Sequence, residues 1–174
     1  MLDLRNTLRR PVRMYPDHIA TIYNDKSFTY TEFSERCIRL ANGMLDLGLQ
    51  RGDRVAVLML NSHRFLELYY ATLLAGLVIV PLKIRWGEQE FAYALSDCTP
   101  KLFAIDQTIY GHLKEHIEAL KMLGIQHYLF ADEDTPEGLV DYESLVRDSS
   151  PEDPDIEVHD DDLVGLFYTS GTTS

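Results

Sequence analysis

Residues 54–60 read Arg-Val-Ala-Val-Leu-Met-Leu, a run in which every side chain after the first is apolar. Gly52 and Asp53 form a predicted turn in front of this run, and Asn61 and Ser62 follow it. A short apolar run between turn residues is typical of a strand that is buried on both faces. Such strands occur in parallel sheets that carry helices on each side. Residues 54–60 therefore indicate an α/β fold.

Predicted helices flank this strand on both sides along the chain. Thr29 and Glu32 fit a capping box, in which each side chain accepts a hydrogen bond from a free backbone amide of the first turn. Apolar residues then recur at helical spacing, and Gly48 stands where a left-handed residue ends the helix. A second helix is predicted over residues 61–75, and His63 is expected to form a hydrogen bond near its start.

The alternation of short apolar strands with longer helices continues along the chain. Further strands are predicted at 78–80, 101–105, 126–130 and 163–168, and further helices at 86–96, 108–123 and 142–146. An opening helix at 2–14 and a hairpin of 19–23 with 27–29 precede them. The pattern predicts an α/β domain with a mostly parallel sheet flanked by helices, in which strands 54–60, 78–80, 101–105 and 126–130 are neighbours. We divide the chain into an N-terminal α/β subdomain at 1–162 and a strand with its loop at 163–174.

The charge of the chain argues against two classes of partner. Its formal net charge is −12, and an acidic surface repels both nucleic acid and anionic lipid. Acidic residues concentrate at 132–137 and 152–162, which we interpret as solvated connections, with a metal or partner site as the alternative. No apolar stretch is long enough to span a bilayer, and none follows the N-terminal arginines, so we predict neither a transmembrane segment nor a signal peptide.

Cysteine and histidine residues give little sign of catalysis. Cys37 and Cys98 are the two cysteines, and each sits among apolar residues at helical spacing. We predict that both are buried and that the protein is cytoplasmic. His112 and His116 lie four residues apart on a predicted helix, a spacing that zinc ligands use. Because no third ligand is evident, an exposed helix surface is the preferred interpretation.

The chemically informative residues come last, as Tyr168, Thr169, Ser170, Gly171, Thr172, Thr173 and Ser174. An apolar strand here leads directly into a loop of small hydroxyl residues around one glycine. Glycine lets the backbone approach an anion closely, while successive amides and hydroxyls donate hydrogen bonds to it. The loop lacks the spacing of a Walker sequence, and most Ser/Thr/Gly runs are ordinary turns. Its position at the end of a predicted parallel strand is where ligands bind in α/β proteins, but taken alone the run is still better interpreted as an ordinary turn.

Several ordered motifs together resemble one enzyme family. They are Tyr-Pro-Asp at 15–17, Phe-Thr-Tyr-Thr-Glu-Phe at 28–33, Gly-Leu-Gln-Arg-Gly-Asp-Arg-Val-Ala at 48–56, Ala-Gly-Leu-Val-Ile-Val-Pro-Leu at 75–82 and Tyr-Thr-Ser-Gly-Thr-Thr at 168–173. The chain resembles the adenylate-forming enzymes, which include acyl-CoA synthetases, firefly-type luciferases and peptide-synthetase adenylation domains. Two positions depart from the family pattern. Lys83 stands where Asn is usual, and Ser174 stands where the loop usually continues towards Pro-Lys-Gly.

The resemblance implies the N-terminal fragment of an ATP-dependent acyl-CoA synthetase. Such an enzyme uses ATP, Mg²⁺ and CoA, and activates a carboxylic acid as its acyl-adenylate. A fatty acid is our first expectation for that acid and an aryl acid is the second. The resemblance assigns Thr169, Ser170, Gly171, Thr172, Thr173 and Ser174 to binding of the β and γ phosphates. It places the catalytic lysine, the metal-binding glutamate and the adenine and acyl pockets downstream, so we expect this chain alone to be inactive.

Two alternatives to this interpretation stay open. One is a non-catalytic scaffold or dimerisation module, and the other is an aryl-acid or amino-acid adenylation enzyme. The gene sequence after Ser174 separates enzyme from scaffold, since a downstream Pro-Lys-Gly and a long continuation indicate the enzyme and a stop codon indicates the scaffold. Apolar surface that the rest of an enzyme would cover favours association, so we expect a homodimer or aggregate of the chain.

Overall fold

The computed structural model describes residues 3–114, 120, 122–159 and 161–169 of the 174-residue chain. The described strands of the main sheet are β3 (Arg54–Leu58), β4 (Val78–Pro81), β5 (Leu102–Ile105), β6 (His127–Phe130) and β7 (Val140–Asp141). The hairpin strands are β1 (Ile19–Tyr23) and β2 (Lys26–Thr29). The described helices are α1 (Asn6–Met14), α2 (Tyr30–Asp46), α3 (His63–Leu74), α4 (Glu88–Cys98), α5 (Gln107–Leu113) and α7 (Tyr142–Asp148).

The five-stranded sheet has the order β4-β3-β5-β6-β7, and each pair of neighbouring strands is parallel. Val55 of β3 lies opposite Ile79 of β4 on one side and Leu102 of β5 on the other. This arrangement confirms the predicted parallel sheet and the predicted neighbours. The short strand β7 was not predicted, because two residues carry no readable alternation.

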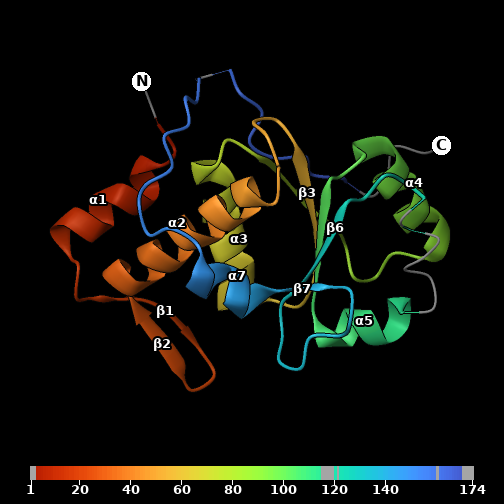
Figure 1. Cartoon of the computed structure of the whole chain (residues 1–174), viewed down its shortest axis with the longest axis horizontal. Helices are drawn as coiled ribbons and strands as arrows, with labels where there is room; N and C mark the ends of the chain where they lie inside the picture. The colour runs from red at the N-terminus through yellow and green to blue at the C-terminus, as the bar shows by residue number, and fades with distance from the viewer. Residues whose placement is uncertain (1–2, 115–119, 121, 160, 170–174) are drawn as a thin grey trace.

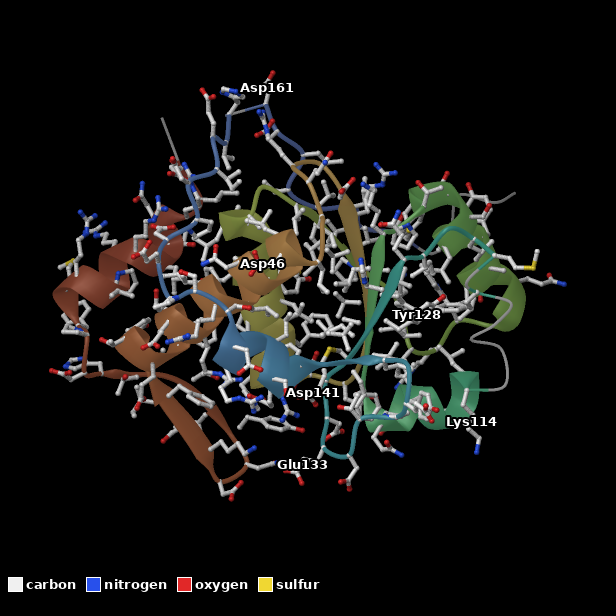
Figure 2. All side chains as sticks on the ribbon, viewed as in Figure 1. Asp46, Lys114, Tyr128, Glu133, Asp141 and Asp161 are labelled. Atoms are coloured by element: carbon white, nitrogen blue, oxygen red, sulfur yellow. The ribbon has the colours of Figure 1, made fainter. Side chains whose placement is uncertain are left out.

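The sheet is the middle layer of three (Figure 1). Val55 and Val57 of β3 pack into a core shared with α1, α2, α3 and α7, whereas Ala56 and Leu58 face a second core shared with α4 and α5. Figure 2 shows Tyr128 of β6 on the side of the sheet towards α4. Burial on both faces explains why the strand sequences are continuously apolar rather than alternating.

The predicted capping signals of the first long helix form as expected. The carboxylate of Glu32 accepts a hydrogen bond from the backbone N–H of Thr29 at 2.8 Å, and the Thr29 hydroxyl oxygen accepts one from the Glu32 N–H at 3.2 Å. Gly48 has a φ of 92°, the left-handed conformation that glycine adopts with little strain. These two features set where α2 begins and where the chain turns towards β3.

Two predicted elements differ from the structure or extend beyond its description. Residues 163–168 form a single parallel bridge, Gly165 with Ile79, rather than a full strand. The ring of Phe167 lies 2.7 Å from where a side chain on Gly165 would begin, so a larger residue at position 165 would clash with it. The helix predicted at 108–123 is described as α5 to Leu113, and residues 115–119 and 121 lie outside the described residues.

Candidate functional site

The segment before the predicted phosphate-binding loop lies along β4. The N–H of Ile79 donates to the carbonyl of Val164 at 3.2 Å, and the N–H of Leu166 donates to the carbonyl of Ile79 at 2.9 Å. Because this bridge is parallel, the segment runs in the same direction as the sheet strands. The predicted loop therefore begins four residues after a parallel bridge to β4.

Tyr168 joins this segment to α4. Its hydroxyl donates a 2.6 Å hydrogen bond to the carboxylate of Asp97, in the last turn of α4. Its ring meets the ring of Trp86 edge-on, with centroids 5.9 Å apart and an interplanar angle of 78°. The ammonium of Lys83 lies 5.8 Å from the centroid of the same Trp86 ring. Trp86, which follows β4, and Asp97 of α4 therefore fix the side chain of Tyr168, the residue that immediately precedes the predicted loop.

The pKa values of the Tyr168 hydroxyl and of the two cysteine thiols are all raised, which favours their protonated forms. Partial burial, followed by the hydrogen bond to Asp97, raises the pKa of the Tyr168 hydroxyl. Burial raises the pKa of the Cys98 thiol to about 11, and burial likewise raises that of Cys37. Both thiols are buried and free, as predicted. Since the thiolate is the nucleophilic form, neither cysteine is suited to covalent catalysis at neutral pH.

The structure places only one of the six predicted phosphate-binding residues. Thr169 is exposed at the end of the bridged segment. Ser170, Gly171, Thr172, Thr173 and Ser174 lie outside the described residues, so their role stays a prediction. Asp97 was missed by the sequence reasoning, because nothing in the sequence marks a contact between residues 71 positions apart.

A separate cavity of about 350 Å³ opens at the carboxyl ends of β3, β5 and β6. The chain leaves β3 towards β4 on one side and leaves β5 towards β6 on the other, so the cavity lies at the point where the strand order reverses. Its lining residues come from the hairpin turn and from three loops: Tyr23, Asn24, Asp25, Lys26, Met59, Leu60, Ser62, His63, Arg64, Asp106, Thr108, Ala131, Asp132 and Glu133. Figure 2 shows Glu133 near the tip of the hairpin.

His63 is the least expected residue in this cavity wall. Its side chain is 3% exposed, and its Nδ1 has no hydrogen-bond partner among the described residues, contrary to the bond predicted at the helix start. The ring instead packs against Phe28 and Tyr23, with centroids 5.2 and 5.7 Å away. Burial, followed by the nearby cations Arg64 and Arg36, lowers the pKa of His63 to about 4. His63 is therefore neutral at physiological pH.

The residues that line the cavity do not indicate one class of ligand. Lys26 and Arg64 line it together with several carboxylates, so charges of both signs face the space. Among the described residues, no group of three or more His, Cys, Asp or Glu side chains could hold a metal ion. His112 lies in α5, whereas its proposed zinc partner His116 falls outside the part of the chain that the structure describes. In the same part, none of the helices has the length and apolar character needed to cross a bilayer.

Comparison with protein families matches the AMP-binding enzyme profile to residues 8–174. The chain belongs to the AMP-binding enzyme family. A feruloyl-CoA synthase from Amycolatopsis sp is 37% identical to this AMP-binding chain over 164 residues, covering 94% of the chain and 30% of that protein. A long-chain-fatty-acid–CoA ligase from Thermus thermophilus is 35% identical over 147 residues, covering 83% of the chain and 26% of the ligase. The AMP-binding chain thus spans less than a third of the length of these two relatives.

Solved structures agree with this family membership. The N-terminal domain of FACL13 from Mycobacterium tuberculosis superimposes with a TM-score of 0.85 at 28% identity, covering 99% of this chain and 42% of that one. The anthranilate CoA ligase AuaEII, solved with anthranoyl-AMP, gives a TM-score of 0.89 over 98% of this chain and 32% of its own. At 22% identity the second match supports the fold alone. The AMP-binding chain therefore has the N-terminal fold of adenylate-forming acyl-CoA ligases.

Proposed function

We propose that this chain is the N-terminal part of an ATP-dependent acyl-CoA synthetase. The observation that carries the proposal is the run of small hydroxyl residues from Thr169, which follows a segment bridged in parallel to β4, in a chain that the family profile matches from residue 8 to 174. The names of its relatives support an acid–thiol ligase, since they include a feruloyl-CoA synthase and a long-chain-fatty-acid–CoA ligase.

The proposed reaction has two steps. A carboxylate oxygen attacks the α-phosphorus of ATP, the bond to the β-phosphate oxygen breaks, and pyrophosphate leaves with that electron pair. The thiolate of CoA then attacks the acyl carbon of the acyl-adenylate, and AMP leaves. The first step converts a poor acyl donor into one with a phosphate leaving group, and it needs fixed donors around the phosphates as charge moves onto pyrophosphate.

We assign the chain's own contribution to the first step. In this proposal the hydroxyls and amides of Thr169, Ser170, Gly171, Thr172, Thr173 and Ser174 hold the β and γ phosphates. Mg²⁺ would neutralise phosphate charge when bound. The described residues offer no carboxylate or imidazole cluster to hold that ion, so its protein ligands are proposed to lie outside them. The contribution that we propose for this chain is therefore the positioning of the β and γ phosphates.

The acid substrate is proposed at the level of a class. A fatty acid is the first candidate, supported by the Thermus thermophilus relative at 35% identity. An aryl acid is the second, supported by the feruloyl-CoA synthase at 37% identity. The test incubates the full-length protein that contains this chain with ATP, Mg²⁺, CoA and a panel of fatty and aryl acids. Acyl-CoA and AMP formed in equal amounts support the proposal, and formation of neither with any acid contradicts it.

The association state and the location of the protein are further parts of this proposal. Large apolar side chains such as Phe167, Leu163 and Tyr93 are more than half exposed, which favours burial against a second copy. Sedimentation of the 174-residue chain should show a dimer or larger species, and a monomer at high concentration would contradict the association. Two buried free cysteines favour a cytoplasmic protein, which cell fractionation can test.

A further inference from the structure

The outward side of α3 is apolar, which is unusual for a helix at the surface of a protein. The inward side of α3 buries Leu68, Ala71 and Leu74 in the core beneath it. On the opposite side, apolar and aromatic residues recur at positions i, i+3, i+4 and i+7 of the helix. These residues, which we call the α3 stripe, are Leu66, Tyr69, Tyr70 and Leu73. A surface helix normally carries charged and polar residues on the side away from its core, so the α3 stripe is typical of a surface that another group covers.

The α3 stripe is accessible and its rings are held in place. Leu66 is 40% exposed, and the other three residues of the stripe are partly exposed. The ring of Tyr69 packs against Phe65 with centroids 5.5 Å apart, and the ring of Tyr70 meets Phe33 of α2 edge-on at 5.7 Å. The four stripe residues line a surface hollow of about 280 Å³. Aromatic rings that are already fixed lose little conformational entropy when a partner covers them.

Charge distinguishes the α3 stripe from other exposed apolar positions. The chain carries a formal net charge of −12, and two copies that associate around a twofold axis bring the same surface patch of each copy together. Acidic groups on such a patch repel one another. Tyr93 of α4 is 65% exposed, but Glu90 and Asp97 lie about one turn before and after it and are exposed as well. Among the described residues, no charged side chain lines the hollow of the α3 stripe.

We propose that the α3 stripe is the surface through which this chain associates with a second copy of itself. The inference rests on the self-association in the proposed function, and it is independent of the acyl-CoA synthetase activity. Pairing of two stripes removes apolar side chains of both copies from water without bringing carboxylates of the stripe together. The phenol groups of Tyr69 and Tyr70 suit such a contact, because their rings pack while their hydroxyls can still form hydrogen bonds at its edge.

The size of the α3 stripe determines how strong the association should be. Stable complexes bury about 20–30 residues on each side, whereas the stripe offers four residues per copy. We therefore expect a weak dimer with a Kd of about 0.1–1 mM. Such a dimer forms at high protein concentration and dissociates on dilution.

The experiment is sedimentation equilibrium of the 174-residue chain over a range of protein concentrations that spans the expected Kd. The variants are Leu66→Gln, Leu73→Gln and the double variant. Tyr93→Gln is the matched control, because it places the same polar residue at an exposed apolar position of α4. None of these substitutions changes the net charge, and glutamine is a good helix former. Thermal unfolding of each variant checks that it is folded.

We expect Leu66→Gln and Leu73→Gln each to raise the Kd of the dimer by about tenfold, because each substitution removes an apolar contact from both copies. The double variant should be a monomer at every concentration, and Tyr93→Gln should match the unsubstituted chain. A second measurement uses the unsubstituted chain alone. Its methyl NMR signals from Leu66 and Leu73 should shift on dilution, whereas those of Ile22, which is 71% exposed on the hairpin, should not.

The outcomes separate this inference from the proposals on which it rests. A dimer whose Kd is unchanged in the Leu66→Gln and Leu73→Gln variants, or is raised as much by Tyr93→Gln, overturns the α3 stripe as the interface and leaves self-association intact. Methyl signals of Leu66 and Leu73 that do not change on dilution of a dimer overturn it as well. A monomer at every concentration overturns self-association and the inference together. The enzymatic proposal is unaffected by these outcomes, since acyl-CoA formation tests it separately.

Discussion

Arg36 of α2 binds both carboxylate oxygens of Glu67 of α3, through Nε at 2.7 Å and Nη2 at 3.1 Å. Glu67 is completely buried, and the hydroxyl of Tyr142 in α7 donates to it at 2.7 Å. Arg36 also reaches Glu143 at 3.0 Å. One buried carboxylate thus joins three of the helices that cover one face of the sheet, α2, α3 and α7.

Replacing Glu67 with Ala should lower the free energy of unfolding by about 3–5 kcal/mol, because it leaves buried partners of the carboxylate unpaired. Glu35→Ala is the matched control. Glu35 forms an exposed pair with Arg39 one helical turn away, and such pairs contribute about 0.5 kcal/mol or less. Urea unfolding of the chain measures both values. Equal decreases in the free energy of unfolding of the two variants would show that burial of Glu67 adds nothing to the stability that its ion pair with Arg36 provides.

Gly43 allows α2 to approach α7 closely, so Gly43→Ala should destabilise the chain by about 1–3 kcal/mol. A side chain at Gly43 would begin 2.6 Å from Cγ of Leu145 and 2.7 Å from Oγ of Ser149. Gly111 is the control, because it lies within α5 and has no atom within 4 Å of the added carbon. Gly111→Ala should stabilise by up to about 1 kcal/mol through helix propensity. Stabilisation by both substitutions in thermal unfolding would contradict the close helix contact.

The neutral state of His63 predicts a specific loss of stability in mild acid. Its pKa is about 4 in the folded chain, against 6.5 as the ordinary value, so the unfolded chain binds the proton first. The stability from neutral His63 is present above pH 6.5 and is lost as pH falls towards 4. At about 1.4 kcal/mol per pH unit, the full loss is about 3 kcal/mol.

His63→Phe should flatten the stability profile between pH 6.5 and 4, because phenylalanine can pack against Phe28 and Tyr23 without titrating. The exposed His112, replaced by Gln, serves as the control and should keep the slope of the unsubstituted chain. Chemical unfolding at a series of pH values measures the slopes. An unchanged slope in His63→Phe would mean that other groups cause the acid sensitivity.

The parts of the fold that were predicted correctly carry local signals. The apolar run at 54–60 gave the buried strand β3, and Thr29 with Glu32 gave the start of α2 through contacts three residues apart. Gly48 gave the end of that helix through its own backbone conformation. Such features depend on neighbours in the sequence, so they can be recognised before the chain is folded.

The features that were missed depend on contacts between distant residues. Nothing near residue 63 in the sequence reveals that the hairpin packs its aromatic rings on His63 and leaves Nδ1 unpaired among the described residues. The joint of Asp97 with Tyr168 likewise needs α4 and the last segment to meet in space. The segment predicted as a strand at 163–168 forms one bridge, Gly165 with Ile79, and the extent of such a pairing is not visible in the periodicity of the sequence.

The 174-residue chain by itself should show no acid-dependent ATP–pyrophosphate exchange and should bind ATP only at millimolar concentrations or weaker. Ordering each loop residue costs about 1–2 kcal/mol of backbone entropy, and six residues offer few contacts to offset it. Calorimetric titration with ATP measures the affinity. Exchange above background by the chain alone would mean that the catalytic groups lie within residues 1–174.

The most direct measurement is acid-dependent ATP–pyrophosphate exchange by the full-length protein that contains this chain, with and without Thr172→Ala and Thr173→Ala. The account predicts exchange with at least one fatty or aryl acid and a decrease of roughly 100-fold or more in the doubly substituted protein, because removing fixed donors from a charged transition state has effects of that size. Exchange that is unaffected by both substitutions, or no exchange with any acid, would contradict it.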